Sequence, residues 1–223
     1  MNNKRFYAVA VLACLAMLAQ SANAEKGFKY SYGEFGYYGV DAPTGDGGGF
    51  RAAFSFGATD YVNIIGEYNR LFGTDDVDNL GGQKFSTNED IDRDEFKIGF
   101  GVHYPVMDNM DLTFTTAYVD QEFRGDWVVP FLPTTPPTPG PVKTNVSESE
   151  EGYEARFGAR VKAFKKFEFT PHVVHKEVGN DSNTGGGLGV VYKFYKKFSV
   201  RVKGTFYSDD SESEMFAGVR LNL

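Results

Sequence analysis

The chain has 223 residues, with 30 acidic and 23 basic side chains and a formal net charge of −7. This acidic balance argues against a nucleic-acid partner, which would require a basic surface. No stretch beyond the N-terminal segment approaches the 18 consecutive apolar residues of a transmembrane helix. The 21 Phe, 13 Tyr and 26 Gly residues, with few segments of helical period, favour a β protein over a helical bundle.

The first 24 residues have the three parts of a secretory signal peptide. Lys4 and Arg5 form its positive region, residues 6–18 its apolar core, and Ala-Asn-Ala at 22–24 its cleavage site. An alternative reading makes Cys14 the lipidated cysteine of a lipoprotein. Cleavage before Glu25 would leave 199 residues with 21 cations, 30 acids and no cysteine. We therefore expect residues 25–223 to form one exported domain without disulfides.

Apolar and polar residues alternate along the rest of the chain with a period of two, the period of β-strands. The pattern predicts ten strands, at residues 27–40, 48–57, 61–72, 93–104, 110–123, 152–163, 167–178, 186–195, 198–208 and 213–223. The connections alternate between tight turns and longer polar loops. The turns are 58–60, 105–109, 164–166 and 195–197, and the loops are 41–47, 73–92, 124–151, 179–185 and 209–212. In an up-and-down meander, this puts every tight turn at one end, as in transmembrane β-barrels.

The two faces of each strand differ in chemistry. On the fourth strand, for example, Phe96, Ile98 and Phe100 face away from Glu95 and Lys97. The apolar face ends in aromatic residues close to the tight turns, as an interfacial girdle would: Tyr104, Phe167, Phe194 and Phe198. These features predict an all-β fold, an antiparallel up-and-down transmembrane β-barrel of ten strands, with eight as the alternative count. A soluble exported β-sandwich or lipocalin-like barrel would show the same alternation and stays open.

Two segments depart from the regular pattern. In the first strand, Phe28, Tyr30 and Tyr32 alternate, but Phe35 and Tyr37 shift phase, which suggests a β-bulge. Residues 130–141 hold six of the nine prolines and cannot form an internal strand. We interpret the proline-rich segment as a surface loop, with a ligand-like recognition segment as the alternative.

With these features the chain resembles the small bacterial outer-membrane β-barrels of the OmpA/OmpX-like kind, over its whole mature length. The resemblance implies the outer membrane of a Gram-negative bacterium as its location and outer-membrane lipid and lipopolysaccharide as its surroundings. It also implies recognition of the last strand by the barrel-assembly machinery. The chain ends in GVRLNL, with Leu223 where such proteins usually have Phe. We expect no peptidoglycan-binding domain after the barrel.

The polar strand faces predict a basic barrel interior. Its ten cations are Arg51, Lys97, Arg156, Arg160, Lys162, Lys176, Lys193, Arg201, Lys203 and Arg220, and its five acids are Glu67, Glu95, Asp111, Glu154 and Glu168. A ten-stranded barrel leaves little room beyond its own side chains. We expect a lumen filled by ion pairs, and the alternative is a narrow anion-preferring channel lined by the same residues.

The predicted loops carry the compensating acids: Asp75, Asp76, Asp78, Glu89, Asp90, Asp92, Glu148, Glu150, Glu151, Asp209, Asp210 and Glu212. They are either solvated loops or contacts for a cationic partner or for the divalent cations that bridge lipopolysaccharide phosphates. The acidic run at 75–79 lacks the glycine and distal glutamate of an EF-hand, so we predict no metal site and no cofactor.

We predict a structural or surface-interaction role without catalysis. A surface protease would need an Asp–His pair at the extracellular rim, where Asp209, Asp210 and His175 are the available residues. A lipid A-modifying esterase would need a serine placed beside a histidine, and the chain has no His-x-Ser. Neither enzyme is favoured by the residues present.

Overall fold

The structure, a computed structural model, describes residues 28–42, 45–75, 78–80, 83–84, 89–129, 142–208 and 212–223. The predicted signal peptide and the proline-rich segment 130–141 lie outside these residues, and so does Asp76. Within the described residues, no helix is long and apolar enough to cross a membrane.

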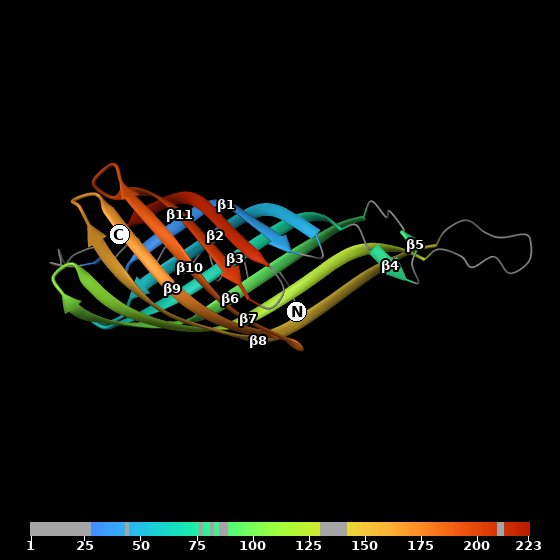
Figure 1. Cartoon of the computed structure of the whole chain (residues 1–223), viewed down its shortest axis with the longest axis horizontal. Coiled ribbons are helices and arrows are strands. Elements are labelled where there is room, and N and C mark those ends of the chain that lie inside the picture. The colour runs from blue at the N-terminus through green and yellow to red at the C-terminus, as the bar shows by residue number, and fades with distance from the viewer. Residues whose placement is uncertain are drawn as a thin grey trace, which may run out of the picture.

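Ten long strands form one closed antiparallel barrel (Figure 1). They are β1 (Tyr32–Ala42), β2 (Gly45–Gly57), β3 (Val62–Asp75), β6 (Glu89–Met107), β7 (Met110–Val129), β8 (Val142–Ala163), β9 (Phe167–Val178), β10 (Asp181–Lys193), β11 (Phe198–Tyr207) and β12 (Ser213–Asn222). The short strands β4 (Asp78–Leu80) and β5 (Gln83–Lys84) pair only with each other, between β3 and β6. Each barrel strand pairs with its neighbours along the chain, and β1 pairs with β12 to close the ring. The prediction of ten strands is confirmed, and the alternative of eight is wrong.

The largest difference from the expected elements lies in β7 and β8. The sequence predicts a loop over 124–151, but these two strands are 20 and 22 residues long and run far into it. The pairing of β7 with β6 ends at Arg124, and the pairing of β8 with β9 begins at Gly152. Residues 125–129 pair only with residues 142–146, and these two segments form a ribbon that projects from the end opposite the C-terminus (Figure 1).

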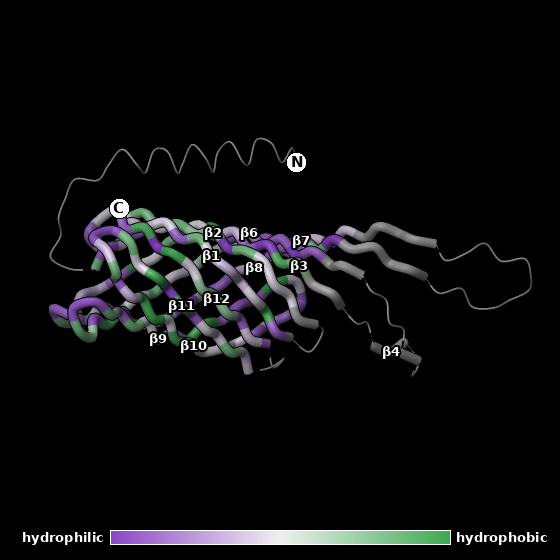
Figure 2. The backbone as a smooth tube through the Cα atoms, turned by 90° about the horizontal axis from the view of Figure 1, so that it is seen from above, coloured by the Kyte–Doolittle hydropathy of each residue, from purple (hydrophilic) through white to green (hydrophobic). Residues whose placement is uncertain are grey.

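The barrel carries apolar side chains outside and charged side chains inside. On β6, Ile98 and Phe100 are about half exposed, whereas Glu95 and Lys97 are buried. The predicted girdle residues are all exposed: Tyr104, Phe167, Phe194 and Phe198. Figure 2 shows hydrophobic and hydrophilic residues alternating along the strands. A closed single barrel is not a sandwich, and an apolar exterior around a charged interior is the reverse of a water-soluble barrel, so the soluble alternative is wrong.

The bulge predicted in the first strand is absent. The pairing of β1 with β12 runs without a register shift from Tyr32 to Asp41. Phe35 and Tyr37 point outward and are 62% and 61% exposed, whereas Tyr38 points inward and is 1% exposed. The phase shift in the sequence arises because this regular strand carries aromatic residues on both faces. Because both faces carry aromatic residues, the alternation in the sequence does not identify the inward face, which includes Glu34.

The segment before β1 folds into the lumen at the tight-turn end. Phe28 is buried, and the ring of Tyr30 stacks on His103 with the ring centroids 3.4 Å apart. The Tyr30 hydroxyl donates a hydrogen bond of 2.7 Å to Asp111. Residues 28–31 therefore fill part of the interior at this end of the barrel.

Candidate functional site

The barrel interior holds most of the charged residues that the sequence places there. Two of the predicted cations differ from the others in their surroundings. Lys193 is exposed at the end of β10, and the Lys162 ammonium lies 4.3 Å from the centroid of the Phe28 ring. The others are buried or half-buried on inward-facing positions: Arg51, Lys97, Arg156, Arg160, Lys176, Arg201, Lys203, Arg220, Glu67, Glu95, Glu154 and Glu168.

A first group of ion pairs, the loop-side network, comprises Arg51, Glu67, Glu95, Lys97, Glu154, Arg156 and Lys176. Lys97 Nζ lies 2.7 Å from Glu154 Oε2 and 3.1 Å from Glu95 Oε1. Glu95 also accepts from Lys176 at 2.5 Å, and Glu154 accepts from Arg156 at 2.7 Å. Arg51 pairs with Glu67. These contacts join β2, β3, β6, β8 and β9 across the lumen.

A second group, the turn-side network, comprises Glu34, Arg160, Glu168, Arg201 and Arg220. Glu34 accepts hydrogen bonds from Arg201 at 2.9 Å and from Arg220 at 2.5 Å. Arg160 holds Glu168 with two bonds of 2.8 and 2.9 Å, the bidentate geometry typical of strong arginine–carboxylate pairs. Arg220 lies 3.8 Å from Glu168 and so links the two carboxylates.

The interior is less basic than the sequence predicts. Of the ten predicted cations, Lys193 lies outside the interior, and Arg93, which was not predicted, lies inside it. Two carboxylates that were not predicted, Glu34 and Glu214, are also buried, so the described interior holds seven acids instead of five. Glu34 was missed because of the overlapping aromatic pattern of β1. Glu214 and Arg93 lie on inward positions of strands that were correctly predicted, so continuing the alternation by one step would have found both.

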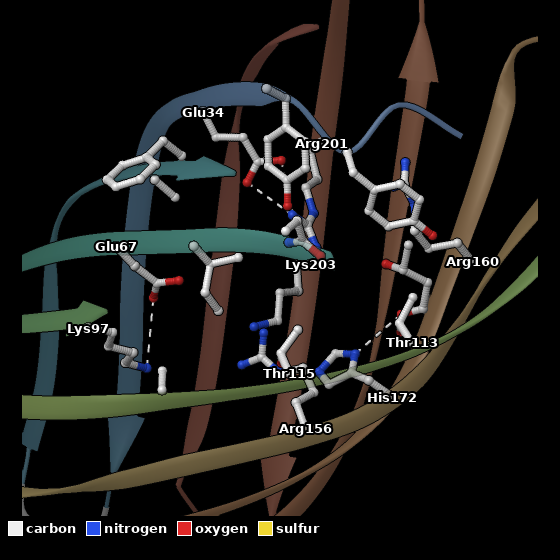
Figure 3. Close-up of a pocket in the computed structure, with 18 of the residues that line it drawn as sticks. Glu34, Glu67, Lys97, Thr113, Thr115, Arg156, Arg160, His172, Arg201 and Lys203 are labelled. Carbon is white, nitrogen blue, oxygen red and sulfur yellow. Dashed lines mark hydrogen bonds and ion pairs between the residues drawn. The ribbon is translucent and has the colours of Figure 1, made fainter. Parts of the chain in front are cut away.

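A cavity of about 140 Å³ lies among the charged side chains of both networks (Figure 3). Its lining includes Tyr30 and Tyr32 from the segment 28–32, and Thr170 and His172 from β9. His172 Nδ1 lies 3.2 Å from the Thr170 carbonyl oxygen, so Nδ1 carries a proton that it donates to this acceptor. Lys203 also lines the cavity and is 3% exposed.

The described residues contain no group of three or more His, Cys, Asp or Glu that could hold a metal ion. The structure describes no Asp–His pair among the three residues available for a surface protease. His175 Nδ1 is 2.9 Å from the Thr184 hydroxyl oxygen, and Asp209 and Asp210 lie outside the described residues.

The acids of the predicted loops are only partly described. Glu148 and Glu151 are exposed on β8, and Asp92 pairs with Arg70 at 2.9 Å. Glu212 lies 3.8 Å from Arg93. The side chains of Asp75, Asp78, Glu89 and Asp90 lie outside the described part.

The closed barrel, with its lipid-compatible exterior and charged interior, defines an integral outer-membrane β-barrel protein. The family described as the outer membrane protein beta-barrel domain matches residues 7–194, and the chain belongs to this family. No curated protein matches the chain.

Several solved structures are similar in fold. Ail, the attachment invasion locus protein of Yersinia pestis, is 10% identical, with 86% of this chain and 99% of that chain covered and a TM-score of 0.38. Neisserial surface protein A is 10% identical, with 91% and 100% covered and a TM-score of 0.43. The translocator domain of the autotransporter NalP from Neisseria meningitidis is 9% identical, with 99% and 98% covered and a TM-score of 0.46.

Proposed function

We propose that this outer-membrane barrel has a structural or surface-interaction role, with a lumen closed by ion pairs, and that it catalyses no reaction. We further propose that it is exported to the outer membrane of a Gram-negative bacterium by a cleaved signal peptide. The barrel-assembly machinery would then recognise the last strand, which ends at Leu223. Outer-membrane lipid and lipopolysaccharide would surround the apolar face.

The observation that carries this proposal is the set of ion pairs that cross the lumen. Lys176 on β9 reaches Glu95 on β6, and Lys97 on β6 reaches Glu154 on β8. Separating such buried partners leaves uncompensated charges, at a cost of about 3–5 kcal/mol for each pair. A continuous water path would require several of these pairs to separate, so a filled lumen is the favoured state.

The ribbon of residues 125–129 and 142–146 supports a role at the surface. It projects beyond the strands that form the barrel, and its described residues pair with no other strand. Glu148 and Glu151 are exposed on β8 close to the base of the ribbon. A cationic surface partner, or divalent cations that bridge lipopolysaccharide phosphates, would complement this charge.

Conductance of the refolded protein in a planar lipid bilayer, under a salt gradient, tests the proposal. We expect a silent bilayer, with gel mobility in SDS that differs before and after boiling as proof of a folded barrel. Discrete current steps would contradict the closed lumen.

A narrow anion-preferring channel is the second candidate, and the basic lining of the cavity favours it. In a channel, Arg156→Glu should shift the reversal potential toward cation selectivity, because the charge beside the path is inverted. Lys197→Glu, in the turn between β10 and β11, is the matched control and should shift it less.

A further inference from the structure

The charge around the interior cavity is strongly unbalanced. Seven cationic side chains line it, against the three carboxylates of Glu34, Glu67 and Glu154. Each of these carboxylates is already engaged by at least one arginine or lysine of the two networks. The positive excess of the whole interior is therefore concentrated at this one place.

Lys203 is a buried cation, 3% exposed, and no hydrogen bond or ion pair with another described residue involves its ammonium. The charges that act on it most strongly are those of Arg156 and Arg51, which repel it, ahead of the attraction from Glu214 and Glu67. A buried charge without a partner is costly, so this position favours a counter-ion.

Arg156 faces the same space. One of its terminal nitrogens is engaged by Glu154 at 2.7 Å, and its Nε has no hydrogen-bond partner among the described residues. Figure 3 shows the ends of the Lys203 and Arg156 side chains directed toward each other. Two cations arranged in this way form the two sides of an anion-binding site.

We propose that the cavity binds a small multivalent oxyanion of the phosphate or sulfate type, with Lys203 and Arg156 as its principal ligands. One water needs about 10–15 Å³ of such space, so about 140 Å³ admits a tetrahedral oxyanion together with water. The several fixed N–H donors favour an anion with several acceptor oxygens over chloride.

The surroundings of the cavity make this a binding site rather than a step on a conduction path. The loop-side network crosses the lumen, and residues 28–31 fill part of the tight-turn end. The inference goes beyond the structural or surface role, since that role requires no ligand in the lumen. A bound anion would also neutralise part of the positive charge that otherwise opposes barrel closure.

Titration calorimetry of residues 25–223, refolded in detergent micelles, tests the proposal with inorganic phosphate as the probe and chloride at equal ionic strength as the reference. We expect saturable binding of phosphate by the wild type. Lys203→Met, which removes the unpaired charge and keeps the length of the side chain, should weaken this binding at least tenfold. The control Lys197→Met alters an exposed turn lysine and should bind as the wild type does.

Unfolding by urea supplies a second readout. Lys203→Met should be as stable as the wild type or more stable in chloride, because a buried unpaired charge has been removed, and phosphate should no longer stabilise it. Absence of saturable phosphate binding by the wild type would overturn the proposal, as would equal binding by Lys203→Met. The bilayer measurement reports separately on the closed lumen, so the two proposals can fail independently.

Discussion

Glu34 is the carboxylate that neutralises two interior arginines. It is 5% exposed, and it accepts from Arg201 on β11 and from Arg220 on β12. The three residues come from the strands on either side of the barrel closure, so the pairing links the first strand to the last two. Its loss would leave two buried guanidinium groups without their main counter-charge.

We expect Glu34→Gln to lower the free energy of unfolding by about 3–5 kcal/mol, the usual cost of breaking a buried ion pair. Urea titration of the protein refolded in lipid vesicles, followed by the circular dichroism of its β-strands, measures this change. Glu177→Gln, at an exposed position bonded to the Tyr153 hydroxyl, is the control and should change little. Equal midpoints for the two variants would mean that Glu34 does not support the closure.

At the scale of the strands, glycines allow β2 to approach β3 closely. A Cβ added at Gly49 would lie 1.8 Å from the Arg70 carbonyl oxygen, whereas one added at Gly33 would meet no atom within 4 Å. The backbone of β3 cannot move away without breaking its pairing with β6. Glycine at position 49 is therefore required by the curvature of the sheet rather than by an unusual backbone angle.

Gly49→Ala should lower the free energy of unfolding by about 1–3 kcal/mol, the usual cost of overpacking. Gly33→Ala makes the same chemical change on β1 and should leave the unfolding midpoint unaltered. The measurement is a parallel urea titration of both variants. A stable Gly49→Ala would show that the sheet relaxes at this point with little cost.

The projecting ribbon of β7 and β8 should be dispensable for folding. Beyond Arg124 and before Ser147, its two strands pair only with each other, so its removal takes no strand pairing from the barrel. Joining Asp126 to Asn145, which are paired, by an Asn-Gly turn should leave the heat-dependent gel shift intact. Loss of the fast-migrating folded band would show that the ribbon is needed for assembly.

At the scale of the whole molecule, the closure of β1 on β12 defines the ten-stranded count. Tyr37 and Ala217 are paired across this closure, and both are exposed on the outer face. Cys14, in the predicted signal peptide, is the one cysteine of the chain, so residues 25–223 with an introduced pair would have only that pair to form a disulfide.

Tyr37→Cys combined with Ala217→Cys should form an intramolecular disulfide on oxidation of the folded protein. The boiled sample should then migrate differently with and without reductant. Tyr37→Cys with Phe157→Cys, which places the second cysteine on β8, a strand that does not pair with β1, should not cross-link. A cross-link only in the control pair would contradict the closed order of strands.

Much of the architecture could be predicted because strand alternation is a local property. Residues 167–178 were predicted with the bounds of β9, and the outward and inward faces of β6 and β12 follow from the period of two. The prediction of strand ends failed where strands have the polar composition of a loop. The polar segments around 124–129 and 142–151 read as loop, yet they pair as strands, because a ribbon in water needs no apolar face to keep its backbone hydrogen bonds.

The candidate site could be predicted in composition but not in pairing. Period-two alternation identifies Lys97, Arg156 and Lys203 as inward residues, but it does not predict which carboxylate, if any, each of them pairs with. Lys203 and Arg156 lie on β11 and β8, which are separated by β9 and β10 in the barrel order, and their approach depends on the stagger of the strands. That no described carboxylate forms an ion pair with Lys203, although Glu214 and Glu67 attract it, is likewise a property of three-dimensional packing.

The amino-acid sequence by itself determined the β class, the number of strands, the alternation of tight and long connections, and the chemistry of the two faces. These follow from the side-chain period and from turn residues, which act over a few positions. Only the tertiary structure decided the regular course of β1, the length of the ribbon, the ion-pair networks and the cavity with its unpaired lysine. These depend on contacts between residues far apart in the chain, such as Glu34 with Arg220, 186 positions apart, which no local pattern encodes.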